Sequence, residues 1–243
     1  MVSNAIENNK SYYIKSLALG DKFSRLDAWY KVDFLIENNI LTKDFVIQNK
    51  DKFLDLLTTT DEMVKVHAWV LARRFADTGY ITKDDIVKRK SYLLPYVQSG
   101  DLTAWWNVTD LINGKYLDKS YLIPYKNIFI ESLKSDNPGV VSDAWHMVPL
   151  LVNAGIINNG DYEEYKKYLF NVLKSSNQYI RLNAWETIID LGEKNILKKE
   201  DLSQFKNNAR ELVEGDDLIK LTSLFDTTND EFIKRLRNLE LLD

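Results

Sequence analysis

Two histidines, His67 and His146, are the residues of this sequence best suited to acid–base or metal chemistry near neutral pH. They stand 79 residues apart, and no H-E-x-x-H or other paired-histidine spacing that would bind zinc is present. The absence of cysteine excludes disulfides and thiolate ligands. There is no glycine-rich phosphate loop and no G-x-S-x-G nucleophile turn, and the carboxylates are spaced as on solvated helix faces. We therefore expect no enzymatic activity, no metal and no cofactor.

Composition and charge narrow the remaining classes of protein. The 243 residues are 45% hydrophobic and 28% charged, which is ordinary for a globular chain. No run of about 18 apolar residues occurs, so no membrane span is expected, and the first residues lack the layout of a signal peptide. The formal net charge is −4, whereas dedicated nucleic-acid-binding domains are more often basic. Together with the lack of cysteine, these features favour a cytoplasmic protein.

A polar residue, an alanine and a tryptophan recur together four times, at Trp29, Trp69, Trp145 and Trp185. The first two tryptophans and the last two are 40 residues apart, and the central gap of 76 residues equals one repeat of 40 and one of 36. This spacing predicts a hidden position at Thr109 and a sixth at Phe225. Nineteen residues before each of the six positions stands a lysine. These lysines are Lys10, Lys50, Lys90, Lys126, Lys166 and Lys206.

Each repeat predicts two helices. In the second repeat the first helix is expected at residues 42–57 and the second at about 62–78, where apolar residues recur at helical spacing. An Asp or Asn eight residues before each tryptophan position is expected to cap the second helix. Gly or Asn ten residues after the tryptophan predicts a left-handed C-cap. These caps are Asn39, Gly79, Gly155 and Asn195, with Gly114 in the third repeat, whose second helix is one turn shorter.

The start of the second helix has a further pattern, which in the second repeat is Asp61, then Val64 and Lys65, then Ala68. Two-helix units of about 40 residues with this pattern resemble HEAT repeats of the armadillo-like α-solenoid family. The resemblance covers nearly the whole chain. It implies an all-α fold, a right-handed α–α superhelix of about six two-helix repeats in one solenoid domain over residues 1–243. The repeats are expected at about 3–39, 40–79, 80–115, 116–155, 156–195 and 196–243.

The tryptophans and lysines suggest two ladders along such a stack. The tryptophans are expected to cover the seams between repeats, with the indole N–H directed at a polar partner, and Trp105 is expected to fill the seam of the third repeat. The alternative is a groove lined by partly exposed indoles. The lysines are expected to have buried stems and to bind carbonyls or a polar row that includes His67, with Lys10 and Lys206 freer.

The second helices of the resembled family line the concave face of the solenoid, so their outward positions are candidate binding residues. In the last repeats these positions are more polar, at Ser142, His146, Pro149, Leu182, Glu186 and Ile189. In the first three repeats they are apolar and aromatic, which is typical of a partner site. The predicted partner-binding residues are Leu26, Tyr30, Val66, Val70, Arg73, Trp106 and Asp110.

Three functions are compatible with this pattern. The favoured one is a non-enzymatic scaffold that binds a protein or peptide on the concave second-helix face. The alternative is a nucleic-acid-binding solenoid similar to HEAT-like DNA glycosylases, in which Tyr30, Trp106 and Asp110 would be the matching residue types. The negative net charge weighs against it, because phosphate contacts dominate such binding. The third is a homo-oligomeric structural element.

Overall fold

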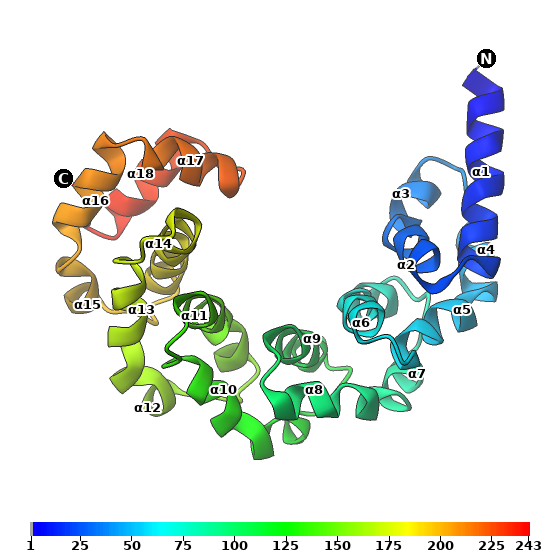
Figure 1. Cartoon of the computed structure of the whole chain (residues 1–243), viewed down its shortest axis with the longest axis horizontal. Coiled ribbons are helices and arrows are strands. Elements are labelled where there is room, and N and C mark those ends of the chain that lie inside the picture. Colours follow the sequence, from blue (N-terminus) through cyan, green and yellow to red (C-terminus); the bar gives the residue numbers. More distant parts are fainter. Residues whose placement is uncertain (1) are drawn as a thin grey trace. The chain divides into compact units, whose positions relative to one another are not determined.

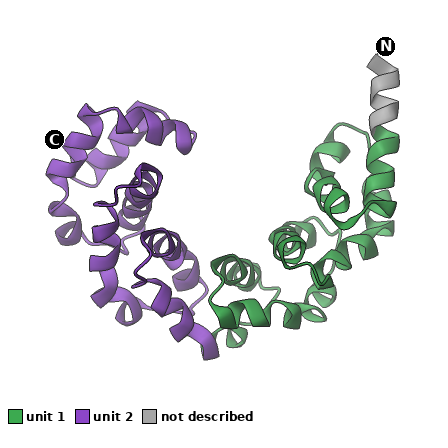
Figure 2. Ribbon diagram, in the orientation of Figure 1, with its two compact units in different colours: residues 1–123 green, residues 124–243 purple. Residues whose placement is uncertain are grey.

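The structure is a computed structural model that describes residues 2–243, with side chains described from residue 10 onward. These residues form α-helices and short 3-10 helices without any strand, which confirms the predicted all-α fold. Among them we find no helix that combines the length and the apolar composition of a membrane span. The chain divides into two compact units, residues 1–123 and 124–243 (Figure 2). The boundary falls inside the predicted fourth repeat, and the single solenoid domain stays a prediction.

The second helices begin where the sequence predicts. Helices α6 (Glu62–Asp77), α11 (Pro138–Asn153) and α14 (Gln178–Glu193) have 16 residues each, whereas α9 (Leu102–Asn113) has 12, one turn fewer. Within each unit they form one layer and the first helices form the other (Figure 1). Each second helix is preceded by an Asp or Asn whose side chain accepts a backbone N–H from the first turn. These caps are Asp61, Asp101, Asn137 and Asn177.

The terminal repeats depart from this pattern. In the first repeat, Asp21 caps α2 (Lys22–Tyr30), which is followed after a break at Lys31 by α3 (Val32–Glu37). In the sixth repeat, Asp217 is the first residue of α17 (Asp217–Leu224) rather than its cap, so that predicted cap was wrong.

The left-handed C-caps occur at four of the five predicted positions, and the third copy differs by one residue. Four caps have the predicted positive φ, as Gly79 does at 78°. In the third copy Gly114 has a φ of −74°, and Lys115 takes the left-handed conformation instead, with a φ of 64°. Lys115 follows Trp105 by ten residues, as each other cap follows its tryptophan. Counted from the end of its helix, Trp105 and not Thr109 is therefore the third tryptophan position.

The first helices are broken, so the prediction of one continuous helix over residues 42–57 was wrong. That segment consists of α4 (Lys43–Gln48), α5 (Lys50–Leu54) and the 3-10 helix η1 (Leu56–Thr58). The break at Asn49 has φ −103° and ψ 8°, a sparsely populated conformation between the helical and extended regions. The Asn49 side chain stabilises it by donating a hydrogen bond to the Phe45 carbonyl at 2.8 Å.

The same break recurs directly before the ladder lysine in every later repeat. Arg89, Tyr125, Tyr165 and Phe205 have φ between −98° and −113° and ψ within about 6° of zero. The lysine is thus the first residue of the segment that follows. In the N-terminal unit the remaining segments are α1 (Val2–Leu19), α7 (Lys83–Val87), η2 (Lys90–Tyr92), α8 (Leu94–Ser99) and η3 (Lys119–Tyr121). Beyond them lie η4 (Ile123–Tyr125), α10 (Lys126–Ser132), α12 (Asn159–Tyr162), η5 (Glu163–Tyr165), α13 (Lys166–Val172), α15 (Lys199–Ser203) and α16 (Lys206–Glu214).

The last helix, α18 (Asn229–Asn238), is fastened to α14 by one arginine. The Arg235 guanidinium lies 2.6 Å from a Glu186 carboxylate oxygen and 2.9 Å from one of Glu193. The hydrogen bonds that Arg235 donates to these carboxylates, above all to Glu193, raise the pKa of Arg235 against the effect of burial. Arg235 therefore holds α18 against α14 at the end of the C-terminal unit.

Replacing Arg235 with Met is expected to lower the free energy of unfolding by about 1–2 kcal/mol, because two carboxylates lose a shared partner in a partly buried site. Urea unfolding followed by circular dichroism measures this change. Arg237→Met is the matched control, since Arg237 is exposed and its guanidinium donates to the Asp243 carbonyl and to no carboxylate of the described residues. Equal destabilisation by the two substitutions would contradict the assignment.

Candidate functional site

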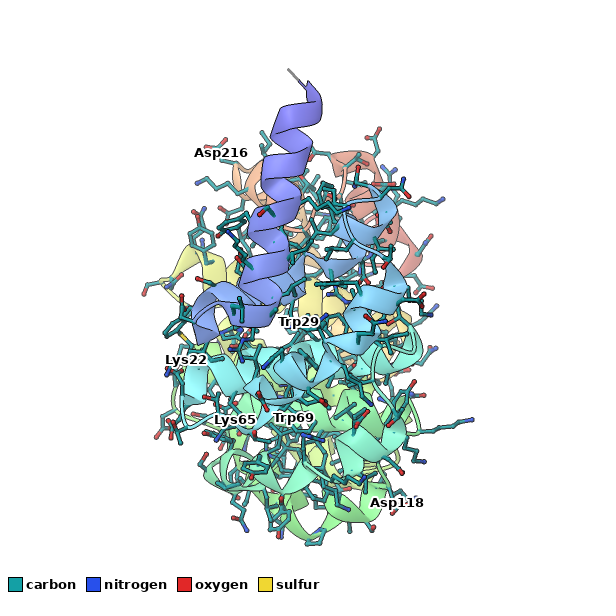
Figure 3. The ribbon with its side chains drawn as sticks, turned by 90° about the vertical axis from the view of Figure 1, so that its right-hand side faces the viewer. Lys22, Trp29, Lys65, Trp69, Asp118 and Asp216 are labelled. Carbon is teal, nitrogen blue, oxygen red and sulfur yellow. The ribbon has the colours of Figure 1, made fainter. Side chains whose placement is uncertain are left out.

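The tryptophan ladder is buried packing. Trp29, Trp69, Trp105, Trp145 and Trp185 are each at most 4% exposed, so the alternative of an indole-lined groove was wrong and the packing role is confirmed. In Figure 3, Trp29 and Trp69 lie one above the other in the N-terminal unit, with Lys22 and Lys65 on the same side of them. Three indoles donate to a carbonyl of their own first helix, as expected, whereas the expectation was wrong for Trp29, whose buried N–H has no partner among the described residues. The pairs are Trp69 to Leu57 at 3.0 Å, Trp105 to Val97 at 3.0 Å and Trp145 to Leu133 at 3.1 Å.

The lysine ladder binds different partners from those expected. Three lysines reach an aspartate of the next repeat instead of carbonyls or the polar row: Lys50 to Asp85 at 2.9 Å, Lys126 to Asp161 at 2.7 Å and Lys166 to Asp201 at 2.7 Å. Each aspartate also accepts the backbone N–H of the residue that precedes that repeat's first helix, Thr82, Asn158 or Lys198, at 2.9 Å. The ladder therefore joins consecutive repeats through their helix starts.

Burial of the ladder lysines is uneven. Of the four inner members only Lys166 is buried, whereas Lys50, Lys90 and Lys126 are half-buried, so the prediction was too general. Lys90 meets Tyr121 at the position where three other repeats have an aspartate, and its ammonium lies 5.3 Å from the ring centre. The terminal Lys10 and Lys206 are exposed, as predicted.

Three predicted binding residues form an exposed apolar row on the N-terminal unit. Tyr30, Val70 and Trp106 are 38%, 41% and 38% exposed, and each directly follows a buried ladder tryptophan. They lie on α2, α6 and α9, which pack in that order. Leu26 and Val66 are half-buried beside them. We call Tyr30, Val70 and Trp106 the apolar row.

The polar members of the predicted site tie the second helices together. Arg73 of α6 forms an ion pair with Asp110 of α9, and Arg74 of α6 forms one with Asp33 of α3 at 3.0 Å. The Tyr30 hydroxyl donates to the His67 carbonyl at 3.0 Å. These bonds position the apolar row, and they leave Asp110 paired rather than available as a general base.

Tyr30 of the apolar row and Tyr80, which bonds to Asp33, are unsuited to act as nucleophiles. Burial raises the pKa of Tyr30. Burial and a hydrogen bond to Asp33 raise the pKa of Tyr80 to about 12. Both hydroxyls therefore stay protonated at neutral pH and serve as hydrogen-bond donors.

The equivalent positions of the C-terminal unit differ. Ser142, Leu182 and Ile189 were expected to point outward but are buried, at most 2% exposed. Packing of α11 against α14 covers this face, and the Asn183 amide donates to the Ser142 hydroxyl at 3.1 Å. The residues that follow the ladder tryptophans here are His146, which is exposed, and Glu186, which is held by Arg235. Pro149 is half-buried. The C-terminal unit thus has no counterpart of the apolar row among these residues.

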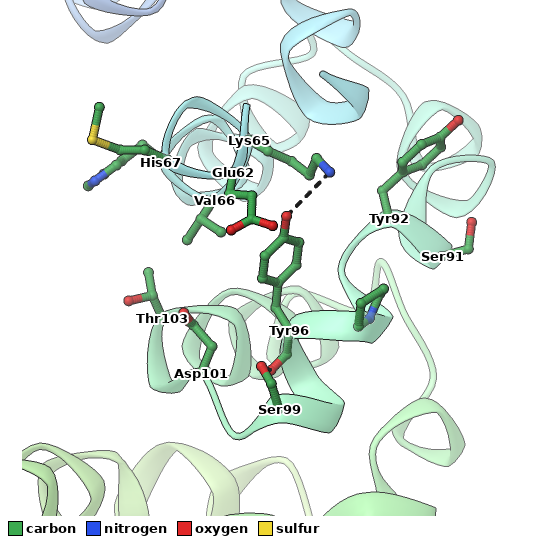
Figure 4. Close-up of a pocket in the computed structure, with 12 residues that line it drawn as sticks. Glu62, Lys65, Val66, His67, Ser91, Tyr92, Tyr96, Ser99, Asp101 and Thr103 are labelled. Carbon is green, nitrogen blue, oxygen red and sulfur yellow. Dashed lines mark hydrogen bonds between the residues drawn. The ribbon is translucent and has the colours of Figure 1, made fainter. Parts of the chain in front are cut away.

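A groove that the sequence did not predict opens between α6 and the following repeat in the N-terminal unit (Figure 4). Its volume is about 840 Å³. One wall comes from the first turns of α6, and the other from η2, α8 and the start of α9. Its position depends on residues that become neighbours only when two repeats stack, so no single stretch of sequence signals it. Its lining includes Glu62, Met63, Lys65, Tyr92, Tyr96 and Asp101.

No grouping of three or more histidine, aspartate or glutamate side chains that could hold a metal occurs within the described part of the chain. Comparison of the sequence with protein-family models and with curated proteins finds no match. The apolar row is therefore the feature on which the function proposed below is based.

Proposed function

We propose that this protein is a non-enzymatic scaffold that binds a protein or peptide through the apolar row of its N-terminal unit. The supporting observation is the pairing, in three consecutive repeats, of a fully buried tryptophan with an exposed apolar residue directly after it. Water-exposed apolar residues aligned on neighbouring helices are typical of partner sites. Because helices pack about 8–10 Å apart, the row extends roughly 20 Å, enough to contact a short helix or an extended peptide.

We further propose that the repeats form a right-handed HEAT-like superhelix. The recurring N-caps, left-handed C-caps and lysine–aspartate links support this proposal, because each repeat uses equivalent residues to contact the next. In such an arrangement the second-helix layer carries the apolar row on the concave face, as the resemblance implies.

The nucleic-acid alternative has weaker support. Its carboxylate, Asp110, is engaged by Arg73, and the net charge of −4 does not favour phosphate binding. Self-association through the apolar row is a second way to cover it, and light scattering at several concentrations distinguishes this from binding of another protein.

Peptides selected by display on the wild-type protein test the proposal. Trp106→Ala is expected to weaken their binding at least about tenfold, because tryptophans at the centre of an interface commonly contribute the most binding energy. His146→Ala is the matched control, since His146 also follows a ladder tryptophan but lies in the C-terminal unit. If the two variants bind the selected peptides equally, the apolar row is not the site.

A further inference from the structure

Trp185 on α14 departs from the hydrogen-bonding pattern of the tryptophan ladder. Trp69 and Trp145 donate their indole N–H to the carbonyl of the residue twelve positions earlier, at 3.0 and 3.1 Å. The same count leads from Trp185 to Leu173. Trp185 is only 4% exposed, yet no described residue accepts its N–H or donates to the Leu173 carbonyl. A buried donor without an acceptor is costly, so a group that binds it gains free energy.

A pocket of the C-terminal unit lies where this hydrogen bond is missing. Its volume is about 240 Å³, and both Trp185 and Leu173 line it. Further lining residues come from α16 and from the loop before α17, among them Asn208, Leu212 and Gly215. Since a water molecule occupies about 30 Å³, the pocket has the volume of about eight waters, or of one amino-acid side chain. The N–H of Trp185 is therefore open to a small ligand.

The charges that line the pocket disfavour an anion. Three carboxylates contribute to the lining, those of Glu211, Asp216 and Asp217. The cation of the lining, Arg181, is already engaged, because it donates to the Ser175 carbonyl at 2.7 Å and reaches Asp217 at 3.1 Å. A carboxylate or phosphate ligand could accept the indole N–H, but it would lie beside like charges. The acceptor that suits this pocket is therefore the oxygen of a neutral group.

We propose that the pocket binds a neutral carboxamide, the group found in asparagine and glutamine side chains and in small primary amides. Its carbonyl oxygen accepts the N–H of Trp185, and its NH₂ group donates to the carbonyl of Leu173. The ligand thus completes a link that the second and fourth repeats form directly. Leu212, which is buried, contacts the aliphatic part of the ligand. This site lies in the C-terminal unit and does not depend on the apolar row.

Titration of the ¹⁵N-labelled full chain with propionamide tests the proposal, followed through the indole N–H signals of its six tryptophans. The signal that disappears in Trp185→Phe belongs to Trp185. In the wild type it is expected to shift in a saturable way, while the signals of Trp69 and Trp145 stay in place. Propionate, which has nearly the same shape but is negatively charged, is expected to leave the Trp185 signal unshifted. Equal shifts with propionate, or no shift with propionamide, would overturn the proposal.

Hydrogen exchange of the same indole groups gives a second measurement on the wild type. Without ligand, the Trp185 N–H is expected to exchange with water faster than the N–H of Trp145, which is bound to the Leu133 carbonyl. Saturating propionamide is expected to slow the exchange at Trp185 and to leave that at Trp145 unchanged. Equally slow exchange of the two groups in the free protein would show that Trp185 already has an acceptor, which contradicts the proposal.

Two matched variants measure the contribution of the indole N–H. Trp185→Phe keeps an aromatic ring but removes the donor, and it is expected to weaken propionamide binding by about three- to tenfold. Trp145→Phe is the control, because its N–H is already bonded within the fourth repeat, and it is expected to bind as the wild type does. Backbone amide shifts of α16 report binding in both. Equal affinity of the two variants would show that Trp185 does not hold the ligand.

The source of the carboxamide is distinguished with N-acetyl-glutamine methylamide. Tighter binding of this compound than of propionamide assigns the group to a side chain of a partner protein, and weaker binding assigns it to a free small amide. Both results agree with the site. N-acetyl-glutamate methylamide is the control and is expected not to displace propionamide. Trp106→Ala is expected to leave propionamide binding unchanged, which separates this test from that of the apolar row.

Discussion

Replacing Trp105 with Ala is expected to lower the free energy of unfolding by about 3–5 kcal/mol, the range typical of large-to-small substitutions at buried aromatic positions. Trp105 is fully buried, and its indole N–H satisfies the Val97 carbonyl at 3.0 Å. Its neighbour Trp106 is 38% exposed, so Trp106→Ala is expected to cost about 1 kcal/mol or less. Urea unfolding followed by circular dichroism compares the two variants directly.

Trp105→Phe separates the two contributions of the indole. Phenylalanine retains most of the buried ring but removes one of the two hydrogen bonds that the Val97 carbonyl accepts, the other coming from the Gly100 N–H at 3.2 Å, so the expected cost is about 1–2 kcal/mol. The order of stability is therefore expected to be Trp106→Ala, then Trp105→Phe, then Trp105→Ala as the least stable. If Trp106→Ala destabilises as much as Trp105→Ala, Trp106 belongs to the core and the apolar row loses its central member.

The adjacent tryptophans show which features the sequence could predict. The period of 40 follows from residue types at fixed spacing, and the structure confirms that the four tryptophans at this spacing are buried, whereas Phe225 is half-buried. The error in the third repeat arose because a missing turn can be placed at either end of a helix without changing which face is buried. The sequence favoured Gly114 as the cap because glycine adopts positive φ without strain. In the structure α9 ends at Asn113, and the residue with positive φ is Lys115, one residue after Gly114.

In the first helices, the buried residues could be predicted from one segment of sequence, but the break in the helix could not. Val46 and Phe53 are buried as their helical spacing predicts, yet the helix breaks between them at Asn49. A signal for the links between repeats was present, since an aspartate follows Lys50, Lys126 and Lys166 by 35 residues. This spacing becomes visible only when the lysine–aspartate pair of repeats two and three is compared with the pairs of the later repeats. The groove had no such signal, because its lining comes from two repeats that become neighbours only in the folded chain.

Replacing Lys166 with Ala is expected to lower the free energy of unfolding by about 2–3 kcal/mol, the second-largest effect among these variants. Its side chain is the most buried of the ladder, at 5% exposed, and its ammonium lies 2.7 Å from oxygens of both Asp201 and Glu163. Removing one member of a buried ionic group leaves the remaining charges uncompensated. The exposure of the two carboxylates, 23% and 42%, places the estimate below that for a fully buried pair.

The control for Lys166 is Lys206→Ala, because Lys206 occupies the same position of the following repeat but is exposed. That change is expected to cost about 0.5 kcal/mol or less. Lys166→Met, which keeps the apolar stem, distinguishes loss of the charge from loss of packing and is expected to remain nearly as destabilising as Ala.

Burial disfavours the charge of Lys166, but its hydrogen bonds to Asp201 and Glu163 outweigh this and raise its pKa. The contribution of the ion pairs is therefore complete below the ordinary lysine pKa of 10.5 and declines only as the pH rises through the raised folded-state pKa. Across pH 6–9 the difference between Lys166→Ala and the wild type is expected to stay constant, and a difference that vanished within that range would show that the ammonium does not stabilise this link between repeats.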